Sequence, residues 1–90
     1  MGIVAIKIKI MPKSLETDLV KIKQEVRRVT ARNNVKNPIF EMQPIAFGLK
    51  ALIVLFGWPE EKELGEFENS LMKIKGVRSV EVIDMRRAIG

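Results

Sequence analysis

Charged side chains are the groups in this chain with which ionic or acid–base chemistry could be carried out. The 90 residues include 16 lysines and arginines and 11 aspartates and glutamates, but no histidine and no cysteine. Imidazole ligands, His-based catalytic triads, thiolate metal sites and disulfides are therefore excluded. The lack of cysteine fits a reducing, cytoplasmic location. The net charge of +5 is compatible with an RNA or an acidic protein surface as partner.

The carboxylates do not form a recognisable catalytic pair. Five glutamates between Glu60 and Glu68 are interspersed with lysine, which is typical of a solvated helix face. The segment Met11–Ser14 has neither the glycine nor the arginine of an acylphosphatase-type phosphate cradle. The chain also lacks both the P-loop and the dinucleotide-binding glycine patterns. We therefore expect no enzymatic activity, no metal and no cofactor.

The first third of the chain predicts a strand followed by a helix. Alternating apolar residues predict a strand with one buried face over residues 3–11. Apolar residues in steps of three and four predict an amphipathic helix from Leu15 to Val29. Ser14 or Thr17 could cap the start of this helix, and Arg32–Asn34 should end it.

The rest of the chain predicts three further strands and a second helix. Residues 37–43 form a weak strand between two prolines, which suits the edge of a sheet. Residues 49–56 are almost all apolar, as in a central strand, and residues 57–59 should turn the chain. A second apolar stripe predicts a helix over residues 60–75, and a last strand follows over residues 77–85.

This order of elements predicts an α+β fold of the ferredoxin-like βαββαβ type. Two split βαβ halves form a four-stranded antiparallel sheet with two helices on one face. The first and third strands lie in the centre of such a sheet, which agrees with their apolar character. We expect residues 1–90 to form a single domain. No apolar run reaches the ~20 residues that a membrane-spanning helix needs, so we expect no membrane contact.

Basic residues on the predicted sheet and first helix leave an RNA-binding function open. Lys7 and Lys9 lie on the outward face of the first strand, and the first helix is rich in lysine and arginine. Base stacking, however, needs aromatic residues on the two central strands, and there only Phe56 is present, at the end of the third strand. An RNA- or ribosome-binding module therefore remains the alternative function. A dimerisation or regulatory module that binds a small ligand is a third possibility.

The loop between the second and third predicted strands carries unexpected apolar residues. Ile45 and Phe47 stand between Pro44 and Gly48, although loops are usually polar and exposed. Apolar loop residues often mark an interface, so we expect Phe47 to meet a partner. The alternative is that Phe47 folds back as a lid on the core. Trp58, by contrast, is expected to pack over the end of the second helix.

Four segments of the chain resemble the archaeal family of translation elongation factor 1-beta. They are "KIKIMPKS" (Lys7–Ser14), "DL" (Asp18-Leu19), "PIAFGLKAL" (Pro44–Leu52) and "IKGVRSVEVIDMRR" (Ile74–Arg87). The third is the most specific of these. The resemblance covers essentially the whole chain.

The resemblance implies a guanine-nucleotide exchange domain that acts by binding, and we expect it to be a monomer. Its partner would be elongation factor 1-alpha, with no direct nucleic-acid contact. In the family, an aromatic residue of this loop enters the nucleotide-binding domain of the partner, and a basic residue near the C-terminus helps to displace magnesium. Phe47 matches the aromatic residue, and Arg87 or Arg86 matches the basic one. The implied contact residues are Ile45, Phe47, Gly48, Lys50, Arg86 and Arg87.

Overall fold

The computed structural model describes residues 2–89, and the side chains of residues 2–87. Strands and helices follow one another in the order β-α-β-β-α-β, with a short 3₁₀ turn, η1, after the second strand. The bounds are β1 Ile3–Pro12, α1 Leu19–Arg32, β2 Ile39–Pro44, η1 Ala46–Gly48, β3 Lys50–Pro59, α2 Gly65–Met72 and β4 Val77–Ile89. None of the helices in this range is long and apolar enough to cross a membrane.

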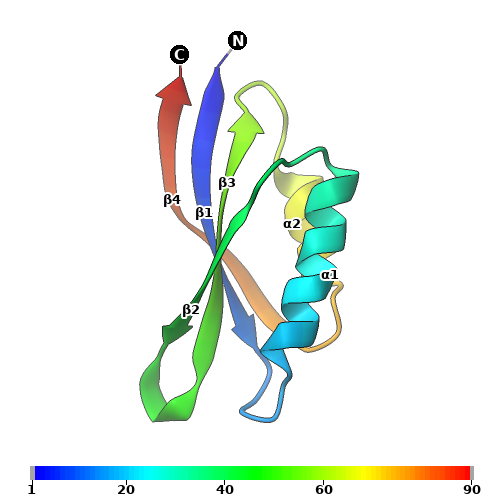
Figure 1. Ribbon diagram of the computed structural model, residues 1–90, viewed down its shortest axis with the longest axis vertical. Coiled ribbons are helices and arrows are strands. Elements are labelled where there is room, and N and C mark those ends of the chain that lie inside the picture. Colours follow the sequence, from blue (N-terminus) through cyan, green and yellow to red (C-terminus); the bar gives the residue numbers. More distant parts are fainter. Residues whose placement is uncertain (1, 90) are drawn as a thin grey trace.

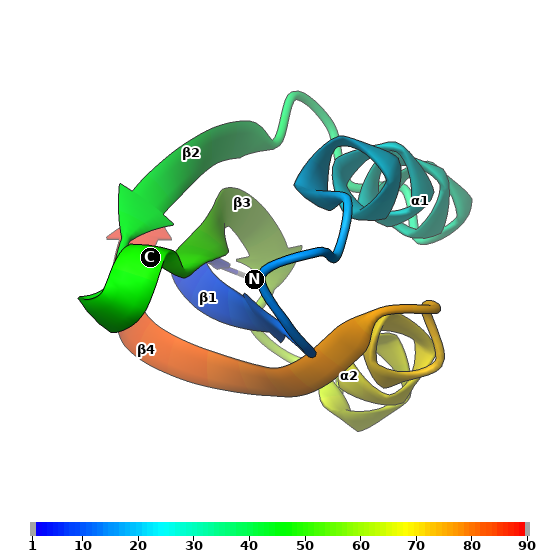
Figure 2. The ribbon, with the colours of Figure 1, turned by 90° about the horizontal axis from the view of Figure 1, so that it is seen from below.

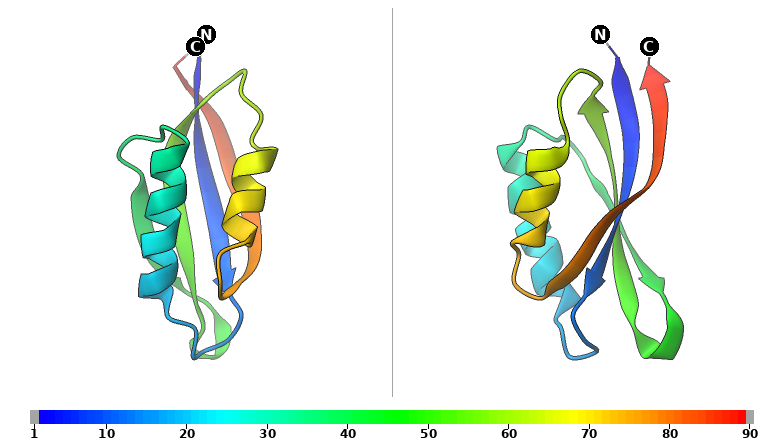
Figure 3. Two further views of the ribbon diagram at one scale, coloured as in Figure 1. Left: turned by 90° about the vertical axis from the view of Figure 1, so that its right-hand side faces the viewer. Right: turned by 180° about the vertical axis from the view of Figure 1, so that it is seen from behind.

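The strands form one antiparallel sheet in the order β2-β3-β1-β4. Both helices lie against the same face of this sheet, and the other face is open (Figures 2 and 3). β1 and β3 are central and β2 and β4 are at the edges, as predicted. The predicted ferredoxin-like α+β fold is therefore confirmed.

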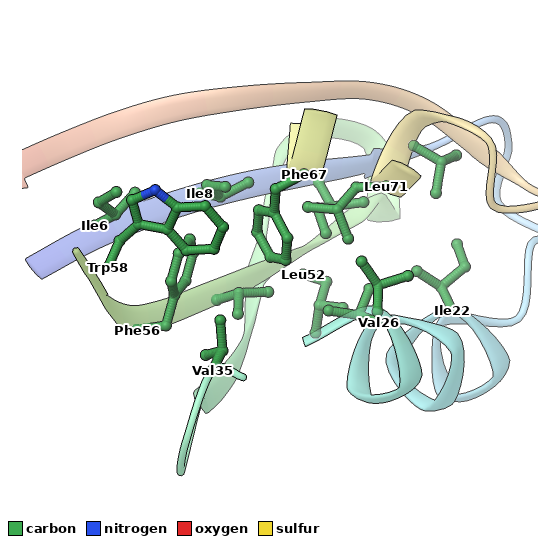
Figure 4. Close-up of a cluster of buried hydrophobic side chains, with 14 residues drawn as sticks. Ile6, Ile8, Ile22, Val26, Val35, Leu52, Phe56, Trp58, Phe67 and Leu71 are labelled. Carbon is green, nitrogen blue, oxygen red and sulfur yellow. The ribbon is translucent and has the colours of Figure 1, made fainter. Parts of the chain in front are cut away.

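The core lies between the helices and the inner face of the sheet (Figure 4). It includes the predicted alternating positions of β1, of which Ile8 has no exposed surface. Near α2, the rings of Phe56, Trp58 and Phe67 form a cluster with centroids 5.0–6.0 Å apart. The indole N–H of Trp58 donates a hydrogen bond of 2.9 Å to the carbonyl of Lys62. The predicted packing of Trp58 on the second helix is confirmed.

The start of α1 differs from the prediction. The helix begins at Leu19 and its N-cap is Asp18, whose carboxylate accepts hydrogen bonds from two first-turn N–H groups at 2.9 and 3.3 Å. Ser14 and Thr17 do not cap the helix but bond to each other in a turn. Leu15 lies in this turn instead of on the helix. The predicted end is confirmed, because Asn33 caps the last turn.

The predicted turn over residues 57–59 is wrong, and so are the bounds of the second helix. Gly57 and Trp58 continue β3 by pairing with residues of β1, and Pro59 ends the strand. The N–H of Glu60 still donates to the carbonyl of Gly2, which keeps the chain beside the sheet. As a result, α2 begins only at Gly65 and ends at Met72, inside the predicted range 60–75.

The edge strands also differ in length from the prediction. β4 does not end at Met85 but continues to Ile89, because residues beyond Met85 keep pairing with β1. Irregular register along this pairing, such as the shift between Lys7 and Ile8, indicates β-bulges, which let the strand stay paired while it bends. β2 begins at Ile39, two residues later than predicted, since Asn37 has a φ of 52° that a strand cannot contain.

Candidate partner-binding site

Phe47 is the most exposed large apolar side chain at the β2–β3 connection. It lies in the turn η1, and 93% of its surface is accessible to solvent. The turn is closed by hydrogen bonds from the Ile45 N–H to the Leu49 carbonyl at 2.7 Å and from the Leu49 N–H to the Ala46 carbonyl at 3.2 Å. The alternative in which Phe47 covers the core is therefore wrong, and Phe47 points into solvent.

The backbone of this turn is itself unusual. Phe47 has φ 61° and ψ 32°, the left-handed conformation, and Gly48 follows with a φ of 78°. Such a conformation costs a residue with a Cβ about 1–2 kcal/mol, whereas glycine adopts it freely. Two successive left-handed residues turn the chain sharply from β2 into β3. Ile45 is half-buried beside the turn, and Lys50 is exposed at the start of β3.

Arg86 and Arg87 do not lie on a tail, because both belong to β4 and pair with Ala5 and Val4 of β1. The Nε atom of Arg87 donates to Oε2 of Glu60 at 2.9 Å. The hydrogen bond to this carboxylate and its charge raise the pKa of Arg87. The Nε atom of Arg86 lies 3.1 Å from Oδ2 of Asp84. Each arginine therefore already has a carboxylate partner.

The β2–β3 connection and the C-terminal end of β4 lie at opposite ends of the sheet (Figure 1), so the Phe47 turn is far from the two arginines. Ala5 is the register partner of both Gly57 on β3 and Arg86 on β4. From Lys50, next to the turn, to Gly57 the strand advances seven residues, or about 23 Å at ~3.3 Å per residue. The predicted site residues therefore form two separate places rather than one cluster.

The acidic residues are spread over several elements of the fold. Among the described residues, no group of three or more Asp or Glu side chains is arranged to hold a metal ion. The glutamates expected on a solvated helix face are divided between the β3–α2 connection and α2 itself. Glu60, the first of them, has the separate role of binding Arg87.

The open face of the sheet does not offer a basic surface to RNA. Lys7 and Lys9 are paired in register with Asp84 and Glu81 of β4. Opposite charges at facing positions of neighbouring strands offset each other. On the outer flank of α1, the guanidinium of Arg27 lies 4.8 Å from the ring centroid of Phe40 in a cation–π contact.

A basic cleft of about 1160 Å³ lies between α1 and α2. Its lining includes the carboxylates of Asp18 and Glu25 and five cations, Lys21, Arg28, Arg32, Lys73 and Lys75. Arg28 is bound by Glu25 at 3.2 Å. Within the described side chains, the other four cations have no carboxylate within 4.0 Å. The described lining of this cleft therefore has more positive than negative side chains.

One residue of the Phe47 end was missed by the sequence analysis. Leu15 was assigned to the apolar stripe of the first helix, but it lies in the β1–α1 loop and is 64% exposed. The atom Cδ2 of Leu15 would lie 3.5 Å from a Cβ built on Gly48, so the two loops are close neighbours. The apolar character of Leu15 in a polar loop, Lys13–Asp18, was the available signal.

Comparison with known proteins gives a consistent result. Residues 5–88 match the family model described as "EF-1 guanine nucleotide exchange domain". The chain is 46% identical over 89 residues to "Elongation factor 1-beta" of Methanosarcina acetivorans, covering 97% of this chain and 99% of that protein. It is 37% identical over 90 residues to the protein of the same name from Methanocaldococcus jannaschii, covering 98% and 100%.

A more distant relative extends this agreement. "Elongation factor 1-beta" of Archaeoglobus fulgidus is 35% identical over 86 residues, covering 94% of this chain and 97% of that protein. The matches are therefore similar in length to this chain as well as in sequence. The protein belongs to the elongation factor 1-beta family.

Proposed function

We propose that this protein is a guanine-nucleotide exchange factor that releases GDP from elongation factor 1-alpha during translation. The observation that carries the proposal is the fully exposed Phe47 on a fixed turn, in a chain that belongs to the elongation factor 1-beta family. The protein acts by binding alone. GDP release requires only that the factor bind the nucleotide-free partner more tightly than the loaded partner.

Phe47 enters the partner and supplies the binding energy by which the factor prefers the nucleotide-free partner to the loaded one. In the free protein the ring contributes little to the core, because almost all its surface is in water. Its left-handed backbone also has an unfavourable conformational energy. A side chain that costs stability and is not buried in its own fold is suited to burial in a partner. Aromatic residues in such positions commonly supply a large share of the binding energy.

The arginines of β4 act at the end of the sheet opposite the Phe47 turn. A cation near a bound magnesium ion raises the electrostatic energy of that ion and weakens its binding. To act in this way, Arg87 must exchange Glu60, or Arg86 must exchange Asp84, for groups on the partner. Both ion pairs are largely exposed to solvent, where such pairs contribute little. The exchange of partners therefore has a low energetic cost.

The separation of about 23 Å along β3 determines how the partner must be contacted. One small pocket on elongation factor 1-alpha does not reach both ends of the sheet. The factor therefore binds along its length, with Phe47 at one contact and the arginines at another. The rigid sheet holds these two contacts at a constant distance. Binding energy gained at the Phe47 contact can therefore perturb the nucleotide site at the arginine contact.

The test is the release of fluorescent GDP from elongation factor 1-alpha of the same organism, followed by stopped flow with excess unlabelled nucleotide. We expect acceleration that saturates with the concentration of the factor. Arg86→Ala and Arg87→Ala are compared with Lys36→Ala, a control on an exposed loop position. An intrinsic release rate that does not change at any factor concentration would refute the proposed function.

RNA binding through the basic cleft is the second candidate function. The observation in its favour is that Lys21, Arg32, Lys73 and Lys75 face the cleft without carboxylate partners among the described side chains. Binding of a fluorescent single-stranded RNA should then weaken steeply with salt. It should also weaken when these four residues are changed to glutamine. Absence of saturable RNA binding at low salt would exclude this function.

A further inference from the structure

The β1–α1 loop and the β2–β3 turn lie at the same end of the molecule (Figures 1 and 3). Leu15 and Phe47, one from each, are both largely exposed. A shallow hollow of about 260 Å³ lies between the two segments. Its lining is polar and apolar in equal measure and comprises Pro12, Ser14, Leu15, Thr17, Leu19, Gly48, Leu49 and Lys50. The volume corresponds to several water molecules at ~30 Å³ each, which is enough to admit a side chain.

We propose that Leu15 and Phe47 form one binding surface, the apolar tip, in which the hollow beside Leu15 receives an apolar side chain of elongation factor 1-alpha. This proposal rests on the proposed function and extends it to a residue outside the β2–β3 turn. Phe47 projects into the partner, while the partner projects into the hollow. Leu15 is a partner-binding residue because it forms a wall of this hollow.

The arrangement of the tip supports an interface rather than an incidental exposed leucine. Leu15 lies outside the core, so its side chain buries little apolar surface within the fold. Lys13 and Lys50 are exposed beside it and give the apolar centre a charged rim, the usual composition of a protein interface. Leu15 and the turn are close neighbours, because a Cβ added to Gly48 would be in ordinary contact with the Leu15 side chain.

Both loops are held in place, which limits the entropy lost on binding. The Lys13 N–H donates to the carbonyl of Gly76 at 2.9 Å, and the Ser14 N–H donates to the hydroxyl of Thr17 at 3.2 Å. The turn around Phe47 is closed by the bond between Ile45 and Leu49 at 2.7 Å. The tip is therefore formed before the partner arrives.

The test measures GDP release from elongation factor 1-alpha with Leu15→Ala, Leu15→Met and Phe47→Ala. Leu15→Ala should raise the factor concentration that gives half-maximal release about tenfold, equivalent to ~1.4 kcal/mol. Leu15→Met keeps an apolar side chain of similar volume and should remain close to the wild type. Ile39→Ala is the matched control, since Ile39 is a similarly exposed aliphatic residue on the edge strand β2.

The outcomes separate this inference from the proposed function. If the wild type accelerates release and Phe47→Ala impairs it, but Leu15→Ala matches the wild type within twofold, the apolar tip is wrong and the exchange function stands. If the wild type does not accelerate release, the exchange function itself is wrong. Thermal unfolding of each variant shows whether a loss of activity reflects a loss of fold. Leu15→Asp, which places a charge in the hollow, should abolish binding with the fold intact.

Discussion

Replacing Phe47 by glycine, asparagine or alanine is expected to separate its role in partner binding from its cost to the fold. The side chain is 93% exposed, so its removal takes almost no buried apolar area from the folded protein. Its φ of 61° is unfavourable for alanine as well as for phenylalanine, tolerated by asparagine and free for glycine. Stability should therefore follow the backbone preference of the new residue, whereas exchange activity should depend on the missing ring.

The two expected effects have opposite signs. In Phe47→Gly, relief of the left-handed conformation contributes about 1–2 kcal/mol, and the larger entropy of the unfolded glycine removes about 0.4–1 kcal/mol. The net gain lies between about 0 and 1.6 kcal/mol, and its midpoint of ~0.8 kcal/mol corresponds to a rise in Tm of about 3–6 °C for a domain of this size. Losing a phenylalanine that is buried in a partner costs about 2 kcal/mol, or ~30-fold in affinity.

Thermal and urea unfolding measure the change in stability. The release of fluorescent GDP from elongation factor 1-alpha measures the change in affinity for the partner. Phe47→Ala keeps the unfavourable backbone and should leave Tm near that of the wild type, while it reduces exchange as strongly as Phe47→Gly. A fall in stability of more than ~1.5 kcal/mol in Phe47→Ala would show that the ring packs on its own core. Unchanged exchange in all three variants would show that the ring does not bind the partner.

Three further changes test other parts of the structure. Trp58→Ala should destabilise the protein by about 3–5 kcal/mol in urea unfolding, since the ring is buried and its N–H is bonded; full retention of stability would contradict the packing. Gly76→Ala should cost at least ~1–2 kcal/mol, because the residue has a φ of 92° and its Cβ would lie 2.8 Å from Cγ2 of Thr17. Glu60→Gln should release Arg87 and change Tm little, because the pair is exposed; a changed exchange rate would reveal a role for this pair.

The sequence was sufficient for the element types and their order because the inner faces are regular. The alternation in β1 and the run of apolar residues in β3 can be satisfied only by central strands. The boundaries were less accurate where two local signals competed. Leu15 continues the helical spacing of the apolar residues of α1, but the hydrogen bonds between Ser14 and Thr17 hold it in a turn. Asp18 then provides the N-cap one residue beyond the predicted candidates.

The end of β3 shows a different limit of sequence reasoning. Gly57 and Pro59 are residues that usually interrupt a strand, so a turn was expected. Pairing with β1 outweighed this preference, since Trp58 gains a buried place against Phe67 only if the strand continues. The contact between Arg87 and Glu60 depends on this longer strand and joins residues 27 positions apart. No local pattern could therefore have predicted it.

The pattern of apolar residues did not predict whether the Phe47 side chain is buried or exposed. An apolar residue in a loop can fold back or project outward, and the composition of the loop is the same in both cases. The structure decides between them, because Phe47 lies in a left-handed turn with 93% of its surface in solvent. Gly48 has a φ of 78°, which explains why a residue without a Cβ stands there.

A single strand connects the two places that we expect to contact the partner. β3 begins two residues after Gly48, and it ends one residue before Glu60, which binds Arg87. Residues 51–54 of this strand are buried, and both its neighbours in the sheet are hydrogen-bonded to it. Its length is therefore fixed by the core of the protein and does not adjust when the partner binds. On the proposed function, such a rigid factor would act by moving the partner rather than by changing its own shape, as the release of a tightly held nucleotide requires.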